Sequence, residues 1–286
     1  MINVRLAGGL GNQLFQLAAA LAVRGDSDVL LDTDGLRNYA VKRSFDLPRI
    51  LSLPQTIRTN ESPSPRVRWK SWLHTARVGR WLPGIAVNDR NFRAKLERDL
   101  SGESPRSLWM DGYFQQHWSA SAFEKSCAQM TAMMRPDLPH SRVDAGTGVI
   151  HIRGGDFLSS ELHRVVDADY YVRALMALRT RRPDMRSFCL ITDDPGYAQP
   201  ICDRIQEAHP EVTLAMAPRA HEGDVPNWLQ DIVLLRYAPA RIIGNSSFAW
   251  WAAALDPQRA LTLSPDRWTR HATRDLVLSW EITLPV

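Results

Sequence analysis

The chain of 286 residues carries 35 lysines and arginines against 31 aspartates and glutamates, and its formal net charge at pH 7 is +4. Hydrophobic residues at 44% and charged residues at 23% are typical of a soluble globular protein long enough for two domains. No apolar run approaches the roughly 20 residues of a membrane-spanning helix, and no basic leader precedes the first predicted strand, so we expect a cytoplasmic protein. The cysteines Cys127, Cys189 and Cys202 lack metal-ligand spacing, which argues against structural zinc.

The first predicted unit is a strand at residues 2–6 followed by a helix at residues 12–24, with glycines between them. A glycine turn between a strand and a helix brings backbone N–H groups and a helix N-terminus up to an anion. Gly9, Gly11 and Asp32, which ends a second predicted strand at residues 28–34, also form most of a dinucleotide fingerprint. The third glycine of that fingerprint is replaced by Leu14, so a nicotinamide-dependent enzyme is an alternative with weaker support.

The middle of the chain is basic and rich in tryptophan. Between Arg58 and Arg98 there are ten basic and three acidic residues, and the stretch at 66–84 interleaves three tryptophans with cations. Three interpretations stay open: a solvated helical face with buried tryptophans, contact with an anionic membrane surface or a lipid-linked substrate, and nucleic acid, for which no binding motif is present. We expect helices joined by loops over residues 52–108.

Strand and helix patterns alternate over much of the chain, which predicts an α/β protein with parallel sheets. Residues 135–148 contain two prolines and two glycines and few large apolar residues, which is typical of a linker. We therefore predict two domains, residues 1–140 and residues 141–286.

Polar side chains follow three predicted strands in the second half, at the point where each strand ends. Strand by strand they are His151, Arg153 and Asp156; Thr192, Asp193 and Asp194; and Asn245, Ser246 and Ser247. Because a ligand of an open parallel sheet lies outside the carboxyl ends of the strands, we expect the three clusters to face one crevice.

Two of these clusters suit phosphate. The Arg153 guanidinium can make two parallel charge-assisted hydrogen bonds to a phosphate; the alternative is a surface arginine paired with Asp156. Residues 245–247 stand where a helix N-cap belongs, and capping is compatible with offering hydroxyl and N–H groups to a second phosphate oxygen.

The other polar groups have plainer interpretations. Asp193 and Asp194 resemble magnesium ligands, but they are contiguous, so hydrogen bonding or turn structure is favoured. Asp231 has the pattern of an exposed helix carboxylate. We interpret Trp250 and Trp251 as core residues.

Four motifs occur in order along the chain: GGLGNQLFQLA at 8–18, HIRGGDF at 151–157, TDDP at 192–195 and GNSSFAWWAAAL at 244–255. Together they resemble the α-1,2-fucosyltransferases of glycosyltransferase family 11. The family pattern H-x-R-R-G-D-Y is altered here, because position 154 is glycine and position 157 is phenylalanine. Arg153 matches the arginine that holds the donor diphosphate in related fucosyltransferases, and we expect Gly154→Arg to be tolerated.

The resemblance implies a GT-B fold, in which two Rossmann-like domains face each other across a cleft. It also implies transfer of L-fucose from GDP-β-L-fucose to the 2-hydroxyl of a galactoside in a bacterial glycan, with inversion and without a metal. GDP-fucose would be a co-substrate, so no cofactor is expected. The acceptor would be a galactoside-containing oligosaccharide, for which a lipid-linked form and peripheral contact with the inner face of the cytoplasmic membrane stay open.

The resemblance also assigns roles to residues. Arg153 would meet the diphosphate, and His151 and Asp231 would lie near the guanosine. The donor-binding set is completed by Asp156, Asp193, Asp194, Asn245, Ser246, Ser247 and Phe248 from the second domain and by Gly9, Gly11, Asn12 and Gln13 from the first. Asn12 is the residue expected to reach the fucose. Candidate bases for the acceptor hydroxyl are Asp32 and Asp34, with water or the phosphate as alternatives.

Other functions stay open at this stage: a transferase of the same fold that uses another GDP-sugar, a nicotinamide-dependent oxidoreductase, and a non-catalytic nucleotide-binding module.

Overall fold

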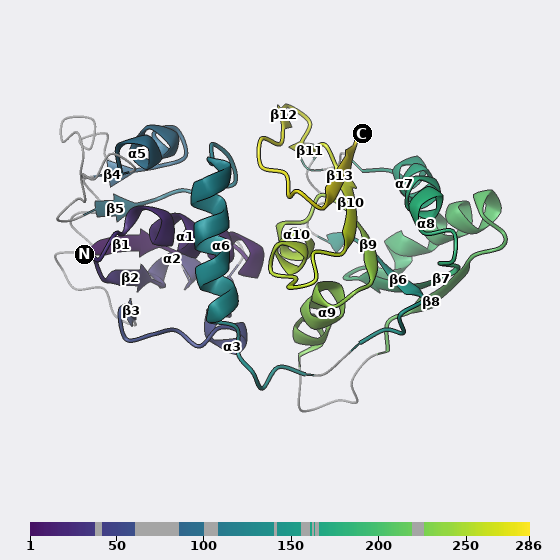
Figure 1. The fold of residues 1–286 in the computed structure, drawn as a ribbon, viewed down its shortest axis with the longest axis horizontal. Coiled ribbons are helices and arrows are strands. Elements are labelled where there is room, and N and C mark those ends of the chain that lie inside the picture. The colour runs from purple at the N-terminus through teal and green to yellow at the C-terminus, as the bar shows by residue number, and fades with distance from the viewer. Residues whose placement is uncertain are drawn as a thin grey trace. The chain divides into compact units, whose positions relative to one another are not determined.

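A computed structural model describes residues 1–37, 42–60, 86–99, 108–139, 142–155, 161, 163, 166–218 and 226–286. The chain forms two compact units, Met1–Pro136 and Asp137–Val286 (Figure 1). The sequence analysis placed the boundary between residues 140 and 141, within its linker. Among the helices that the structure describes, none is both long enough and apolar enough to span a bilayer.

The first unit is built on a five-stranded parallel sheet of order β3-β2-β1-β5-β4 (Figure 1). Its strands are β1 (Ile2–Arg5), β2 (Val29–Asp32), β3 (Ile57–Asn60), β4 (Ala86–Val87) and β5 (Leu108–Met110), and its helices are α1 (Leu10–Val23), α2 (Asp34–Arg37), α3 (Leu47–Ile50), α5 (Phe92–Asp99) and α6 (Ala120–Ala132). Helix α1 is almost wholly buried and packs against α6. Its run of leucine and alanine therefore serves as a core helix.

Two details of this unit differ from the sequence prediction. Helix α1 begins at Leu10, so Gly11 lies inside the helix and the turn is made by Gly8 and Gly9 alone. The region predicted as helices and loops contains the strands β3 and β4 as well as α5. The tryptophan-rich stretch at 66–84 lies outside the described residues.

The second unit is built on a six-stranded sheet of order β13-β10-β9-β6-β7-β8, in which all neighbours are parallel. Its sheet strands are β6 (Thr147–Ile152), β7 (Ser187–Thr192), β8 (Thr213–Met216), β9 (Ala240–Ile243), β10 (Leu261–Pro265) and β13 (Glu281–Leu284), and its helices are α7 (Ala168–Arg181), α8 (Pro195–Ala208), α9 (Asn227–Arg236) and α10 (Ser247–Ala254). A small antiparallel pair, β11 (Arg267–Thr269) and β12 (Ala272–Thr273), follows β10.

The strand order of the second unit is that of a dinucleotide-binding Rossmann sheet. The chain runs outward from β6 through β7 to β8, returns to place β9 on the other side of β6, and then continues outward again. The order reverses between β6 and β9, and in such sheets the ligand binds at the carboxyl ends of the strands at that point. The topology therefore directs attention to the loops after Ile152 and Ile243.

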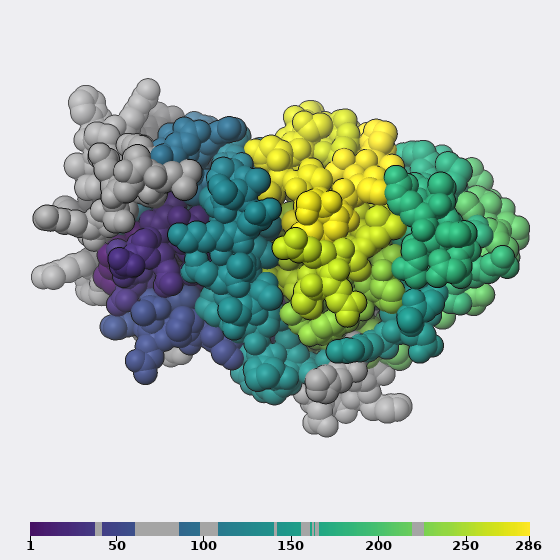
Figure 2. All heavy atoms as spheres, viewed as in Figure 1, coloured from purple at the N-terminus to yellow at the C-terminus, as the bar shows by residue number. Residues whose placement is uncertain are grey.

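A buried apolar cluster between the sheet and its helices holds this edge in place. Ile150, Ile152 and Ile242 from the sheet pack with Leu175 and Tyr171 of α7, all at most 2% exposed. The C-terminal segment, yellow in Figure 2, lies on the surface of the same unit.

Candidate functional site

The backbones of β6 and β9 come close together where the sheet order reverses. The N–H of Gly244, just after β9, donates to the carbonyl of His151 at 3.2 Å, and the Tyr171 hydroxyl donates to the same carbonyl at 3.2 Å. A Cβ at position 244 would lie 2.8 Å from the Tyr171 Oη, so this close approach requires glycine. The ends of β6 and β9, where the sequence predicts a crevice, are thus neighbours in the sheet.

His151 is a neutral, buried imidazole at this point. Burial, aided by the charge of Arg153, lowers its pKa to about 4. Its Nδ1 is buried without a hydrogen-bond partner among the described residues, and its ring lies 6.3 Å from the Phe248 ring, centroid to centroid. A neutral imidazole with an unused nitrogen can exchange a hydrogen bond with a base or ribose without adding charge.

Arg153 forms an ion pair with Asp193, which follows β7. The second oxygen of the same carboxylate accepts the N–H of Gly154 at 2.8 Å. The alternative partner considered for Arg153, Asp156, lies outside the described residues. Asp193 thus ties the turn after β6 to the end of β7, and it holds the guanidinium at the edge of the sheet with about a quarter of the side chain exposed.

The turn after Arg153 has little room for larger residues. A Cβ at Gly154 would lie 2.7 Å from the Cβ of Asp194 and 3.2 Å from the Tyr197 ring. Gly155 has φ +54°, which favours glycine. The expectation that Gly154→Arg is tolerated is therefore wrong for this conformation of the turn, because Asp194 would have to move.

Asp194 caps a helix. Its side chain accepts the N–H of Tyr197 at 3.0 Å at the start of α8, and its backbone N–H donates to the Thr192 hydroxyl at 3.1 Å. With Asp193 paired to Arg153, the two contiguous carboxylates have the turn and hydrogen-bonding roles that the sequence favoured over a magnesium site. Across the described part of the chain, no three His, Cys, Asp or Glu residues are grouped to hold a metal ion.

Helix α10 begins just after β9, at the same edge of the sheet. Ser246 is its N-cap and its hydroxyl accepts the Ala249 N–H at 3.4 Å. The Asn245 amide donates to the carbonyls of His163 at 2.7 Å and Trp268 at 3.1 Å, so this side chain holds loops together. The first N–H groups of a helix lack intrahelical acceptors and carry partial positive charge, which makes the partly exposed Ser247 and Phe248 positions suitable for an anion.

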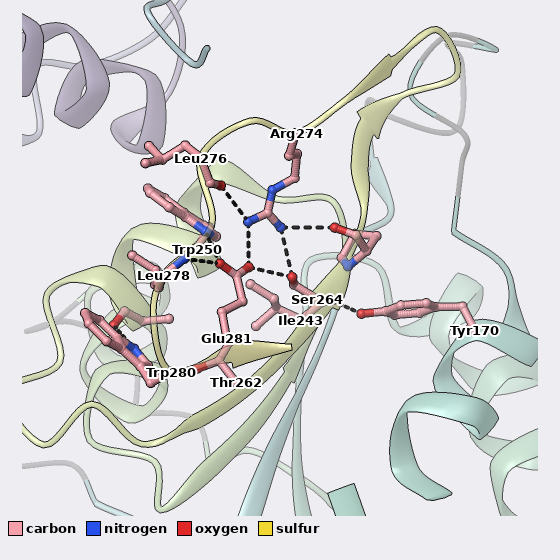
Figure 3. Close-up of polar contacts among 12 residues, drawn as sticks. Tyr170, Ile243, Trp250, Thr262, Ser264, Arg274, Leu276, Leu278, Trp280 and Glu281 are labelled. Atoms are coloured by element: carbon pink, nitrogen blue, oxygen red, sulfur yellow. Dashed lines mark hydrogen bonds and ion pairs between the residues drawn. The ribbon is translucent and has the colours of Figure 1, made fainter. Parts of the chain in front are cut away.

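A buried ion pair between Arg274 and Glu281 holds α10 through a hydrogen bond to Trp250 (Figure 3). The Arg274 guanidinium donates to Glu281 at 2.6 Å, and the other carboxylate oxygen of Glu281 accepts the Trp250 indole N–H at 3.2 Å. The Ser264 hydroxyl joins the same carboxylate at 2.5 Å, and the Arg274 guanidinium lies 4.5 Å from the Trp268 ring centroid. Trp250 and Trp251 are fully buried, as predicted.

Asp231 lies on α9 and is half-buried. Helix α9 contacts β6, the strand that carries His151.

In the first unit, the glycine turn after β1 is open. Gly8 has φ +80°, and a Cβ at Gly9 would meet no atom within 4 Å. The Asn12 side chain accepts a hydrogen bond from the Gln115 amide at 2.7 Å. Gly9 and Asn12 therefore line an open turn next to the residues that follow β5.

Gln13 has a different position from the one implied by its motif. It is fully buried, and its amide donates to the carbonyls of Gly8 and Ser44 and accepts the N–H of Asp46, at 2.9 to 3.2 Å. Its polar atoms are thus engaged with protein backbone, which makes Gln13 a brace for the glycine turn and for the segment at 44–46.

The two candidate bases differ in environment. Asp32, at the end of β2, is 5% exposed, and burial raises its pKa although the Asp34 N–H donates to it at 3.1 Å. Asp34 opens α2 and is partly exposed. The nearby pair of Arg5 and Asp111, 3.2 Å apart, adds charge to the same edge of the sheet.

The sequence analysis missed the residues that shape the loop after β5. Asp89 accepts the N–H groups of Tyr113 and Phe114 at 3.1 and 2.5 Å, and the Gln16 amide spans from the Ala7 N–H to the Gly112 carbonyl. Phe114 has φ +52°, a conformation that needs such support in a non-glycine residue. The partners of the GYFQ segment at 112–115 are distant in sequence, so no local pattern indicates these contacts.

Comparison with known proteins gives a consistent result. The model of "Glycosyl transferase family 11" matches residues 113–275, more than half of the chain. An "Alpha-1,2-colitosyltransferase" of Escherichia coli is 24% identical over 281 residues, covering 94% of this chain and 92% of that protein. The "O-antigen biosynthesis glycosyltransferase WbnK" of Escherichia coli is 26% identical over 303 residues, covering 92% and 93%.

Among solved structures, the chain is similar to NodZ alpha-1,6-fucosyltransferase co-crystallized with GDP. The TM-score is 0.51 at 17% identity, with 90% of this chain and 92% of that chain covered. This likeness concerns the fold. With two α/β units built on parallel sheets, it confirms the predicted fold class, a GT-B type with two Rossmann-like domains.

Proposed function

The chain belongs to glycosyl transferase family 11, and from this premise we propose that it transfers L-fucose from GDP-β-L-fucose to the 2-hydroxyl of a galactoside in a bacterial surface glycan, with inversion and without a metal. The observation that carries the proposal is the extent of the family match. Residues 113–275 include the ends of β6, β7 and β9, where the candidate donor-binding groups gather.

The donor would bind at the carboxyl edge of the second unit. Arg153 and the N-terminus of α10 supply fixed positive charge for the diphosphate. His151 and Phe248 offer a neutral ring and an apolar ring for the guanosine, and Asp231 is a further candidate for it. The roles of Asp156, outside the described residues, and of Asn12, from the first unit, belong to the same proposal.

In the reaction, the bond between the anomeric carbon and the diphosphate oxygen breaks while the acceptor oxygen attacks from the opposite face. Negative charge develops on the departing GDP, where Arg153 and the helix N–H groups are preorganised to meet it. Because these donors are already cationic or dipolar, the step can proceed without a metal. The acceptor hydroxyl then gives its proton to a base.

Asp32 and Asp34 are the protein candidates for that base. The raised pKa of Asp32 makes its carboxylate a stronger proton acceptor, whereas Asp34 is the more accessible of the two. Water or the departing phosphate are the alternatives.

A second donor has specific support. One relative of this chain is named for transfer of colitose, and colitose is L-fucose without its 3-hydroxyl group. We therefore keep a GDP-linked colitose as the second candidate donor. A nicotinamide cofactor is no longer supported, because the chain is a family 11 glycosyltransferase and Leu14 is fully buried where the fingerprint needs its third glycine.

The proposal also names the acceptor and the place of the reaction. The relative named for O-antigen biosynthesis supports an oligosaccharide acceptor of a bacterial surface glycan. We place the reaction in the cytoplasm, with a lipid-linked acceptor and peripheral membrane contact through residues 66–84.

Transfer assays with purified protein test the proposal. GDP-fucose and GDP-colitose are each incubated with a β-galactoside, and the product linkage is read by NMR. We expect fucose on the 2-hydroxyl with an inverted anomeric centre and an unchanged rate in excess EDTA. Preferred use of GDP-colitose would replace the first donor by the second, and a many-fold loss in EDTA that magnesium restores would refute metal independence.

A further inference from the structure

A pocket of about 710 Å³ lies within the first unit, beside the carboxyl ends of β2 and β3. Its volume is in the range of sites that hold small ligands, roughly 300–1,000 Å³. Three arginines, Arg37, Arg43 and Arg135, are among its lining residues, and none of the described lining residues is acidic. All its lining residues belong to the first unit, whereas the groups at β6 and β9 on which the proposed donor site rests belong to the second.

The three arginines come from three segments of the chain. Arg37 ends α2, Arg43 lies in the stretch before α3, and Arg135 follows α6. Guanidinium groups stay protonated at every physiological pH, so the lining carries three permanent positive charges. Such a surface favours a carboxylate or a phosphate.

The rest of the lining suits a sugar ring. Leu36 and Phe45 provide apolar surface, and Thr33 and Ser44 also line the pocket. The Thr33 hydroxyl donates to the Asn60 carbonyl at 3.1 Å and the Ser44 hydroxyl to the Asp46 carboxylate at 2.9 Å, so each hydroxyl oxygen is left to accept a hydrogen bond from a sugar. A pyranose has an apolar C–H face and a polar rim, which matches an apolar wall bordered by hydroxyl and guanidinium groups.

The wall of the pocket is fixed by a motif residue. Gln13, fully buried in α1, donates to the Ser44 carbonyl at 2.9 Å and accepts the Asp46 N–H at 3.1 Å, while its amide also reaches the Gly8 carbonyl. One side chain therefore connects the open glycine turn to the pocket wall. Thr33, which lines the pocket, stands between the two candidate bases in the sequence.

We propose that this pocket binds a negatively charged sugar residue of the acceptor glycan, with its carboxylate or phosphate on the arginines and its ring against Leu36 and Phe45. The term acceptor rests on the proposed function; the charge preference rests on the pocket alone.

The test measures binding of three galactose derivatives to the full chain by isothermal titration calorimetry. The probes are methyl β-galactoside, methyl β-galactosiduronate and galactose 6-phosphate, with inorganic phosphate as the sugar-free anion. We expect at least one charged sugar to bind about tenfold more tightly than the neutral galactoside, and the stronger of the two charged probes identifies the anionic group. Equal affinity for neutral and charged sugars, no measurable binding, or equal affinity for inorganic phosphate would each overturn the proposal.

Two variants locate the binding. Arg37→Gln and Arg43→Gln should each weaken the charged sugar about tenfold. The control is Arg49→Gln on α3, where the side chain is about half exposed and outside the lining, and it should leave affinity unchanged. An equal loss in the Arg49 variant, or no loss in either pocket variant while the melting temperature is normal, would contradict the assignment.

The two proposals can fail separately. If the charged sugar binds and the variants weaken it but no fucose is transferred from GDP-fucose, the pocket stands and the proposed function falls. If fucose is transferred while the charged and neutral sugars bind alike, the pocket assignment falls and the proposed function stands.

Discussion

At the scale of single residues, Arg153 carries the proposed chemistry. Its guanidinium is held by Asp193, and that carboxylate also accepts the Gly154 N–H. The Arg153 side chain is therefore already held in one orientation before a donor diphosphate binds. It needs less reorganisation during the reaction.

We predict that Arg153→Ala lowers kcat by about 10²- to 10³-fold, the typical effect of losing one preorganised donor. Arg153→Lys should recover little, because a point charge cannot reproduce two parallel hydrogen bonds. Steady-state kinetics and melting temperature on the same preparation make the measurement. The control is Arg204→Ala on α8, which removes an ion-paired, half-exposed arginine away from the strand ends. A folded Arg153→Ala protein with near-normal kcat would show that the ion pair with Asp193 is its whole role.

His151 makes stability depend on pH in a defined direction. Its pKa is about 4 in the folded chain and near 6.5 when unfolded, so below pH 6.5 the unfolded state binds the proton first. Stability is fully retained above pH 6.5 and is lost as pH falls toward 4. Between pH 7 and pH 5 the loss from this residue should be about 2 kcal/mol.

Urea unfolding of the wild type and of His151→Gln at the two pH values measures this effect. The variant, which cannot titrate, should lose about 2 kcal/mol less than the wild type. Equal pH dependence of wild type and His151→Gln would mean that His151 is not held neutral by burial.

The sequence predicts which residues lie at the strand ends, but it does not predict their hydrogen-bond and ion-pair partners. The positions of Arg153, Ser246 and Asn245 at strand ends follow from strand patterns and the known location of ligands in parallel sheets. The pairing of Arg153 with Asp193, 40 positions away, depends on which strands are neighbours. The same limit applies to Gln13, whose partners at 44–46 turn a motif residue into a brace.

At the scale of elements, the orientation of α10 depends on groups at the C-terminal end of the chain. The side chains of Arg274 and Glu281 are at most 1% exposed (Figure 3). Glu281 of β13 accepts hydrogen bonds from Ser264 of β10 and from Trp250 of α10, so the pair connects these three elements. A buried pair of this kind stabilises little in itself, but removing one partner leaves a charge buried without compensation.

We therefore expect Glu281→Gln to destabilise the fold by about 3–5 kcal/mol. The matched control is Glu97→Gln, which breaks an exposed pair with Arg93 and should change stability by at most about 0.5 kcal/mol. Urea unfolding measures both. The double variant Arg274→Met, Glu281→Leu should regain much of the loss, since no charge is left buried. If the free energy of unfolding of Glu281→Gln equals that of Glu97→Gln, water must reach the Arg274 guanidinium.

The elements themselves were predictable where they are long or strongly patterned. The helices α1 and α10 and the strands β1, β2, β6, β7 and β9 were located from the sequence. The strands β3 and β4 were missed; they have four and two residues and are the two edge strands of their sheet. No helix or strand was predicted for residues 256–286, which contain the sheet strands β10 and β13 and the short pair β11 and β12.

At the scale of the whole molecule, the alternation of strands and helices predicts parallel α/β architecture, and the structure and the similarity to NodZ confirm it. Strand order is a different matter. Only the structure shows that β9 lies beside β6 and that the strand order reverses there. The motifs do not identify the acceptor, because the roles proposed for their residues concern the donor.

The central claim is that GDP binds at the carboxyl ends of β6 and β9 in the second unit. Hydrogen exchange of the full chain, measured by mass spectrometry with and without saturating GDP, tests it most directly. We predict slowed exchange in peptides that cover residues 151–155 and 244–249, where backbone N–H groups would bind the diphosphate, and unchanged exchange in peptides that cover α3 and β3. Saturating GDP that leaves both of those peptides unprotected, or that protects only residues 8–16 of the first unit, would contradict the account.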